Sequence, residues 1–309
     1  MMTGLAPNVA PRYGSPMDIG VFVQGATVEE TATHVRAAVD RGIRSIWMPQ
    51  IFGIDAITTI AVIAGEFPDV RFGTAVVPTY PRHPMALAAQ ARTTQQVSGG
   101  RFTLGVGLSH QVVIEGMLDL SFARPASYMR EYLDVLVPLC RGEAVDATGE
   151  RVGFHGALDI PSDPVPVVVA ALGSVMLGLA GSVADGTVTW MTGPQTVSTH
   201  IVPTITAAAA DANRLPPRIV MALPTAVTDD PDGARAAAGS TFEIYGYLPS
   251  YRAMLDREGA GGPADVALVG DDDTVRAGVE AAFEAGATEF VAVPFAGVER
   301  TLDVVASLL

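Results

Sequence analysis

The stretch "VRFGTAVVPTYPRHPMALAAQARTTQQVSGGRFTLGVGL", residues 70–108, contains a strand, a helix and a second strand in that order. Its two outer segments, 70–78 and 101–108, are continuous apolar runs with β-branched residues, a pattern typical of parallel strands that are buried on both faces. The segment between them, 84–100, begins with proline and ends with Gly-Gly, as helices often do. The stretch therefore predicts one βα unit of a parallel sheet.

The same alternation of strand and helix extends over the rest of the chain. The predicted strands span 18–23, 44–49, 70–78, 101–108, 165–172, 186–191, 218–227 and 288–295. Eight such units favour a closed (β/α)8 TIM barrel over an open doubly wound sheet. No internal repeat or linker divides the chain, so we expect a flexible segment 1–17 and a single barrel domain 18–309. The connections 109–125 and 246–265 are expected to be insertion loops, the second of them irregular.

Composition excludes several classes of function. Apolar residues make up 49% of the 309 residues and the net charge is −14, which predicts a large core and repulsion from nucleic acids and anionic membranes. The charge-free run 164–184 is long enough to span a bilayer, but its two prolines and three glycines favour a buried βα unit. The start of the chain lacks the features of a signal peptide. Cys140 is the one cysteine, which fits a core thiol in a reducing cytoplasm.

In a barrel of this kind the chemistry belongs to the loops after the strands. Glycine, proline and aromatic residues dominate those loops, and the five histidines show no metal-binding spacing. We therefore predict no metal, and no GxSxG nucleophile motif is present. "GVGLS", residues 105–109, is not followed at once by a helix, so its glycines favour close approach of a flat ligand over a Rossmann loop.

"AALGSVML", residues 170–177, joins the end of a strand to the start of a helix. The free N–H groups of Gly173, Ser174, Val175 and Met176 would then point at the barrel opening and form an anion site. The alternative interpretation is an ordinary helix with an N-cap serine at Ser174. The spacing alone leaves both open.

Several of these segments together resemble one family. The chain shows a GT-x-V strand, an R-x-P helix start, an A-x-Q-A helix and a G-R-F-x-L-G-x-G strand within 70–110, and "REYLDVLVPLCRGEAV" (130–145) and 171–194 match later segments. Over about residues 18–300 the sequence resembles the bacterial luciferase-like monooxygenase superfamily. More narrowly, it is similar to the oxidoreductases that use the deazaflavin coenzyme F420.

The resemblance implies a barrel with an insertion, usually assembled as a homodimer. It places a non-prolyl cis peptide at Ala75–Val76, beneath the central ring of the cofactor. It implies that Gly105 and Gly107 line the same pocket. It also implies that Gly173, Ser174, Val175 and Met176 hold the phosphate of the cofactor tail.

One position departs from the family pattern. Alcohol and sugar-phosphate dehydrogenases of the family carry an Asp-His or Asn-His pair after the second strand, whereas this chain reads Pro49-Gln50. Glutamine cannot take up a proton at neutral pH, so alcohol oxidation that uses this residue is disfavoured. We expect Gln50 instead to hydrogen-bond a carbonyl of the cofactor or of the substrate.

The resemblance therefore implies a reductase. Reduced F420 would donate hydride to an activated C=C, C=N or C=O bond of a small apolar substrate, with His110 as the favoured proton donor and Tyr80, Glu115 or water as others. One alternative is an FMN-dependent monooxygenase that works with a separate flavin reductase. Another is a non-catalytic F420- or flavin-binding protein, which the absence of a base at Gln50 supports.

Overall fold

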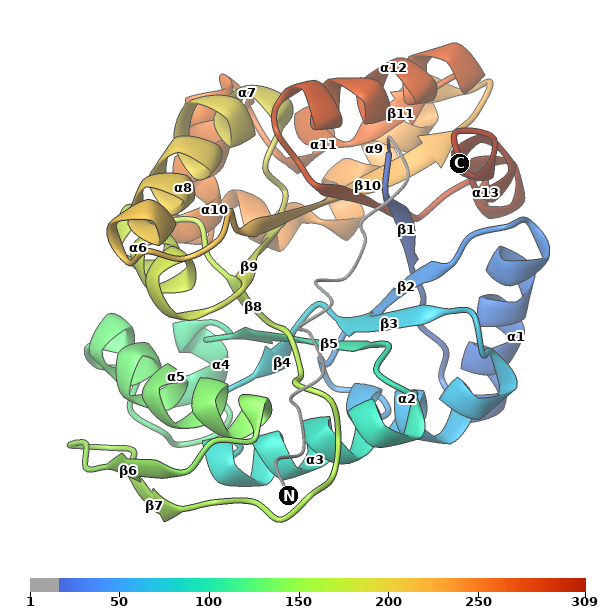
Figure 1. Ribbon diagram of the computed structural model, residues 1–309. Helices are drawn as coiled ribbons and strands as arrows, with labels where there is room; N and C mark the ends of the chain where they lie inside the picture. The colour runs from blue at the N-terminus through green and yellow to red at the C-terminus, as the bar shows by residue number, and fades with distance from the viewer. Residues whose placement is uncertain (1–16) are drawn as a thin grey trace.

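Eight parallel strands close into a barrel in the computed structural model, which describes residues 17–309 (Figure 1). In order around the barrel they are β1 (Ile19–Phe22), β2 (Ser45–Met48), β3 (Arg71–Thr74), β5 (Phe102–Gly107), β8 (Val167–Ala170), β9 (Gly186–Trp190), β10 (Arg218–Val227) and β12 (Glu289–Pro294). The ring closes because β12 pairs with both β10 and β1 in parallel register. The predicted TIM barrel is confirmed. The predicted flexible segment lies outside the described residues, except for Met17.

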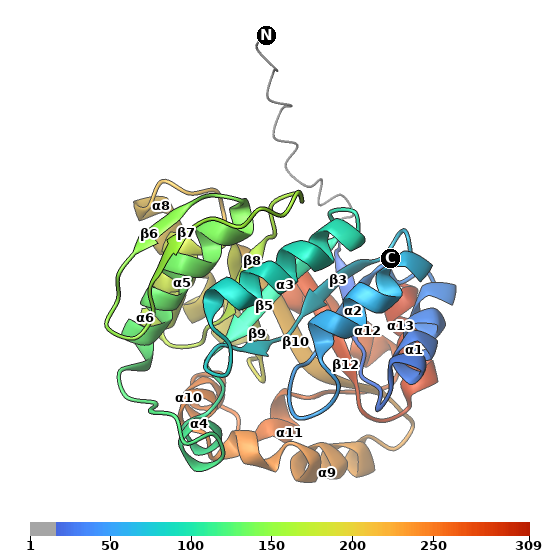
Figure 2. The ribbon, with the colours of Figure 1, turned by 90° about the horizontal axis from the view of Figure 1, so that it is seen from below.

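Helices surround this barrel on its outer side (Figures 1 and 2). They are α1 (Val28–Asp40), α2 (Ala56–Ile63), η1 (Ala64–Glu66), α3 (Pro84–Val97), α5 (Pro125–Arg141), α6 (Ser174–Val183), α7 (Pro194–Thr196), η2 (Val197–Ile201), α8 (Val202–Asp211), α9 (Pro231–Thr241), α12 (Asp272–Glu284) and α13 (Val298–Ala306). Capping side chains and glycines set the ends of these helices. At the start of α1, the hydroxyl of Thr27 accepts a hydrogen bond from the N–H of Glu30 at 3.1 Å. At the end of α5, Gly142 adopts the left-handed region at φ +82°.

The long connections contain more regular structure than the sequence predicted. The first holds α4 (Gln111–Gly116), and the second holds α10 (Pro249–Glu258) and α11 (Pro263–Val266), preceded by η3 (Glu243–Gly246). The prediction of an irregular insertion at 246–265 was therefore wrong. Pro249 occupies the first turn of α10, and Gly259 ends that helix at φ +75°, so the signals for a short helix were present. Strand β11 (Leu268–Gly270), which pairs with β10, was also missed.

Two smaller expectations are confirmed: the run 164–184 forms β8 and α6, and Cys140 is a buried free thiol. The segment around His155 is a hairpin of β6 (Val145–Ala147) and β7 (Phe154–Gly156). In the described residues, 17–309, no helix is both long enough and apolar enough to cross a membrane.

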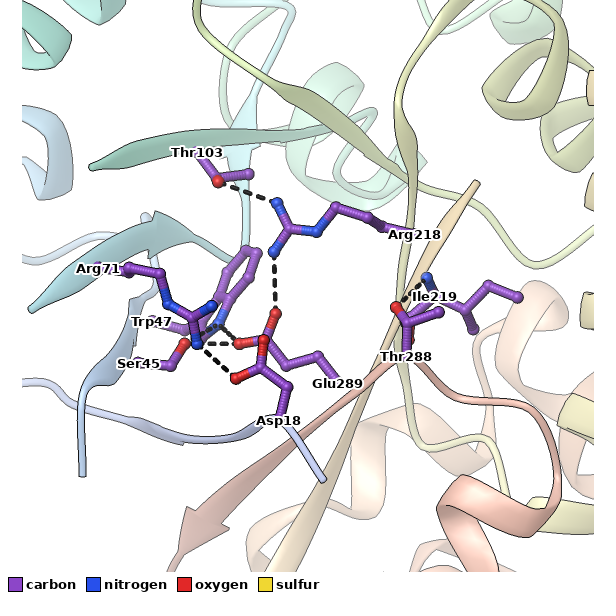
Figure 3. A network of polar contacts seen from close by, with 9 residues as sticks. All are labelled: Asp18, Ser45, Trp47, Arg71, Thr103, Arg218, Ile219, Thr288 and Glu289. Atoms are coloured by element: carbon purple, nitrogen blue, oxygen red, sulfur yellow. Dashed lines mark hydrogen bonds and ion pairs between the residues drawn. The ribbon is translucent and has the colours of Figure 1, made fainter. Parts of the chain in front are cut away.

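A polar network fills the end of the barrel where the strands begin (Figure 3). Glu289, which is 1% exposed, accepts hydrogen bonds from Ser45 Oγ at 2.5 Å and Trp47 Nε1 at 2.8 Å. Its other carboxylate oxygen lies 2.9 Å from Arg218 Nη2. The indole of Trp47 fits because a Cβ at Gly73 would lie 2.5 Å from its ring. This end is therefore closed by packed and hydrogen-bonded side chains.

Above Trp47 the barrel interior is apolar. Its buried residues are Val168, Val188, Val220, Ala222 and Val291. Toward the opposite end, where the strands finish, the residues packed on this cluster become partly exposed; they are Phe22, Ala75, Val76, Ala170, Trp190 and Val293. The floor of the C-terminal opening is thus an apolar surface that solvent or a ligand can reach.

Candidate active site at the C-terminal end of the barrel

A bulge interrupts the third barrel strand at this end. Strand β3 stops at Thr74, and β4 (Val77–Pro78) resumes pairing with β5. The peptide between Ala75 and Val76 is cis, as the resemblance implied, and both residues are partly exposed. The predicted position of the non-prolyl cis peptide is confirmed, and the bulge forms part of the apolar floor.

The glycines of β5 make room for this bulge. A Cβ on Gly105 would lie 1.9 Å from the carbonyl oxygen of Thr74, and one on Gly107 would lie 2.7 Å from a methyl of Val76. The hydroxyl of Thr74 accepts from the N–H of Gly105 and donates to its carbonyl, both at 2.9 Å. The structure therefore gives these buried glycines a packing role, and contact with the cofactor stays a prediction for them.

The N-terminus of α6 lies at the end of the neighbouring strand β8. Its N-cap is Gly173, in extended backbone at φ −78°, and no side chain in the described part of the protein caps it. The interpretation of Ser174 as the N-cap is therefore wrong. Gly173, Ser174 and Val175 are exposed, Val175 by 67%. The helix thus presents its first backbone N–H groups outward, as an anion site requires.

His200 supports this end of α6 from behind. It lies in the π-helical turn η2 and is 8% exposed. Its Nε2 lies 2.8 Å from the carbonyl oxygen of Leu172, the residue that precedes Gly173. The sequence did not indicate this contact, because it joins residues 28 positions apart along the chain.

Gln50 lies at the start of the loop after β2. Its side-chain carbonyl accepts from the N–H of Ala56 at 2.7 Å and so helps to begin α2. Asp55, the N-cap of that helix, accepts from Thr58 N–H at 2.8 Å and also forms an ion pair with Arg82 in the loop after β4. The amide carbonyl of Gln50 is thus engaged within the protein, which leaves its Nε2 hydrogens as the group for any ligand.

His110 follows β5 and occupies the N-cap position of α4, where its side chain makes no capping hydrogen bond with the described residues. Its ring meets those of Tyr245 and Tyr251 edge-on, with centroids 6.4 and 5.9 Å away. Burial lowers the pKa of His110, so the imidazole is neutral at pH 7. The helical insertion therefore supplies an aromatic wall beside His110, extended by further ring contacts among Trp190, Phe242 and Phe295.

The other two proton-donor candidates differ in their surroundings. Tyr80 stacks between Phe122 and Tyr128, with centroids 5.5 and 4.2 Å away, and burial raises its pKa. Glu115 accepts from Gln111 Nε2 at 2.7 Å and from the N–H of Phe122 at 3.1 Å. The bond from Gln111 and that from the backbone lower the pKa of Glu115. It is ionised at neutral pH and organises its loop, as a capping residue does.

Between residues 17 and 309 no group of three or more His, Cys, Asp or Glu side chains is arranged to hold a metal ion. The remaining histidines have partners of their own. His34 Nδ1 lies 2.9 Å from the carbonyl of Gln24, and His83 caps α3 through the N–H of Met85. His155 pairs with Asp146 on the hairpin.

The order of the strands brings most predicted site residues to neighbouring positions. Gln50 follows β2, the cis peptide follows β3, His110 follows β5 and Gly173 follows β8, and these four strands are consecutive in the barrel. All four sites lie where strands end, on the face that carries function in barrels of this class. The fold and this face define a (β/α)8 barrel with an apolar, partly exposed floor at its C-terminal end.

Comparison with known proteins identifies the family. A sequence model described as "Luciferase-like monooxygenase" matches residues 15–292, so the chain belongs to the luciferase-like monooxygenase family. It is 27% identical over 231 residues to the 5,10-methylenetetrahydromethanopterin reductase of Methanolobus tindarius, a match that covers 74% of this chain and 70% of the relative. It is 32% identical over 170 residues to a putative coenzyme F420-dependent oxidoreductase of Mycobacterium tuberculosis, covering 50% and 49%.

Solved structures show the same fold. The coenzyme F420-dependent tetrahydromethanopterin reductase of Methanopyrus kandleri superimposes with a TM-score of 0.79 at 21% identity, covering 95% of this chain and 98% of that one. An F420-dependent secondary alcohol dehydrogenase in complex with an F420-acetone adduct superimposes with a TM-score of 0.78 at 18% identity, covering 95% and 98%. At 21% and 18% identity, these superpositions show that the fold is shared.

Proposed function

We propose that the protein is an F420-dependent oxidoreductase that reduces an activated C=C, C=N or C=O bond of a small, uncharged, apolar substrate. The observation that carries the proposal is the pairing of an uncapped helix N-terminus at Gly173 with a partly exposed cis bulge at Ala75–Val76 on the same barrel face. Three relatives carry F420 in their names, a putative oxidoreductase, a glucose-6-phosphate dehydrogenase and a tetrahydromethanopterin reductase, and these names support the choice of cofactor.

The residues at this face fit such a cofactor. The segment 173–176 itself contains no basic side chain, so a phosphate at this position would be held by backbone donors. The N–H groups of Gly173, Ser174, Val175 and Met176 would bind it. Among the described residues, no atom lies within 4 Å of a Cβ placed at Gly173, so its approach is open. Ala75 and Val76 would support the ring system from below. F420, when bound, supplies the hydride.

The surroundings favour an uncharged apolar substrate. Ile51 and Phe52, in the loop after β2, are 59% and 69% exposed. The guanidinium of Arg82, in the loop after β4, is neutralised by Asp55. Such apolar side chains and paired charges leave little to hold an anionic group.

His110 would provide the proton. Its neutral imidazole carries one N–H, which can hydrogen-bond to a substrate carbonyl or imine and pass its proton to the reduced product as the other ring nitrogen takes up a proton from solvent. The Nε2 hydrogens of Gln50 would orient a carbonyl oxygen, because the Oε1 of that residue is already bonded to Ala56. Gln50 cannot act as the base that alcohol oxidation needs. The absence of a base at this position therefore favours reduction as the direction of transfer.

Titration of the purified protein with F420 and, separately, with FMN tests the cofactor. We expect saturable binding of F420, followed by anaerobic oxidation of bound reduced F420 by neutral cyclic enones or imines. Tight binding of FMN without binding of F420 would favour the monooxygenase, whereas binding of F420 without oxidation by any acceptor would favour the carrier protein. The homodimer and the cytoplasmic location stay predictions.

A further inference from the structure

We propose that His200 is a positioning residue for the phosphate seat, which acts by orienting the Leu172–Gly173 peptide. The inference rests on the proposed function, since the seat at residues 173–176 is part of it. It adds a residue that does not touch the cofactor and that lies on a different helix. The role follows from one hydrogen bond, one peptide plane and the packing of two helices.

The hydrogen bond has only one possible direction. A backbone carbonyl can only accept, so the Nε2 of His200 carries the hydrogen and donates it to Leu172 O at 2.8 Å. This carbonyl precedes the N-cap, and the first carbonyl that accepts within α6 is that of Gly173, from the N–H of Leu177. His200 therefore satisfies a strand-end carbonyl that the helix itself does not use.

The peptide plane transmits this constraint to the seat. The carbonyl and the N–H of a planar trans peptide point in opposite directions. Holding Leu172 O against His200 therefore turns the N–H of Gly173 away from the buried side, toward the exposed N-terminus of α6. Donation to the carbonyl also polarises the peptide and strengthens its N–H as a donor.

The helix that carries His200 is fixed relative to α6. A Cβ on Gly181 of α6 would lie 2.4 Å from the carbonyl oxygen of Ile205 of α8, so the two helix backbones are in close contact. His200 lies in the π-helical turn directly before α8, a widened geometry that often marks functional positions. The imidazole is thus held by a rigid support.

The test compares the affinity for F420 with that for its phosphate-free ribityl deazaflavin fragment. The ratio of the two dissociation constants measures the contribution of the phosphate. We expect His200→Leu to weaken F420 binding about tenfold, the usual size of one lost hydrogen-bond donor, with fragment affinity unchanged. His200→Gln, whose amide can still donate to Leu172 O, should retain the wild-type ratio.

His34 provides a matched control, because it bonds the carbonyl of Gln24 at the end of a different strand. His34→Leu should leave the ratio unchanged. If His200→Leu does not fold, His200→Asn, whose amide is too short to reach Leu172, takes its place. Equal weakening of F420 and fragment, or an unchanged ratio in His200→Leu, would overturn the proposal.

A second measurement separates this inference from the proposed function. Inorganic phosphate is titrated into 15N-labelled protein, and the Gly173 amide is assigned from its loss in Gly173→Ala. We expect phosphate to shift the Gly173 amide in the wild type and His200→Gln, but less in His200→Leu. If phosphate shifts the Gly173 amide in this way but the protein does not bind F420, the role of His200 stands and the proposed cofactor is wrong. Absence of a shift in the wild type would overturn the seat and, with it, the role of His200.

Discussion

The two ends of the barrel are built from opposite kinds of residue. At the end where strands begin, Glu289, Arg218 and Trp47 form a buried network in which charges and hydrogen-bond donors meet partners. At the end where strands finish, the floor is apolar and partly exposed, and the helix after β8 begins without a side-chain cap. Both ends belong to the same strands, so the difference arises from the residues at the strand termini.

This difference assigns stability to one end and ligand binding to the other. A buried charge that has lost its partner is costly, so the network at the closed end must be kept complete. An uncapped helix start and exposed apolar side chains are tolerated at the open end because a ligand can cover them. Substitutions at each end test this difference.

The largest effect is expected from Glu289→Leu at the closed end. It removes the carboxylate of the buried ion pair with Arg218, so the free energy of unfolding should fall by about 3–5 kcal/mol. Chemical denaturation measures the change. Glu66→Gln, which removes a surface ion pair with Arg36, serves as the control and should cost about 0–1 kcal/mol. Similar costs for the two variants would mean that the network is not stabilising.

Gly173→Asp should separate binding from folding at the open end. A carboxylate beside the seat repels phosphate, so F420 affinity should fall about 100-fold. Aspartate is a favourable N-cap, so the melting temperature should not decrease. Gly173→Ala is the matched control: its Cβ meets nothing within 4 Å, and affinity should change less than about threefold. Unchanged F420 binding in Gly173→Asp would refute the seat.

Gly105→Ala tests the link between β5 and the bulge. The added methyl would lie 1.9 Å from Thr74 O, so the bulge must shift, with a loss of about 1–3 kcal/mol in unfolding free energy and weaker cofactor binding. Gly178→Ala, in a helix with nothing within 4 Å of the new Cβ, should instead stabilise by about 0.5–1 kcal/mol. Denaturation and F420 titration measure both. Wild-type stability in Gly105→Ala would contradict the tight packing.

The smallest effect concerns His110 and pH. Burial lowers the pKa of His110 in the folded protein, whereas the unfolded chain titrates near about 6.5. Below that pH the unfolded state gains a proton that the folded state resists, so stability falls as the pH drops. The melting temperature of His110→Phe should therefore fall less than that of the wild type when the pH is lowered from about 7.5 to 5.5. An equal loss in both proteins would show that His110 is not buried in solution.

The barrel could be predicted from the sequence because its strands are continuous apolar runs that alternate with capped helices. The cis peptide at Ala75–Val76 followed only from the family resemblance, since no local pattern indicates it. The sequence could not predict that Gly105 makes room for the bulge, because the bulge lies in another strand. Glycines in "GVGLS" suggested ligand approach, whereas the structure shows a Thr74 carbonyl in that place.

Contacts between distant residues could not be predicted. Glu289 and Trp47 are 242 positions apart, and His200 bonds a carbonyl 28 positions away. The helices of the insertion are short, so α10 was missed although Pro249 and Gly259 mark its ends. The aromatic wall beside His110 depends on those helices, and so it was missed with them.

The most direct test of the central claim is anaerobic rapid mixing of the protein, loaded with reduced F420, with a neutral cyclic enone. We predict that the absorbance of oxidised F420 appears with single-turnover kinetics, and that His110→Phe slows this step while Glu66→Gln does not. Failure of the wild-type protein to oxidise reduced F420, combined with oxygen consumption by the protein loaded with reduced FMN, would contradict the assignment.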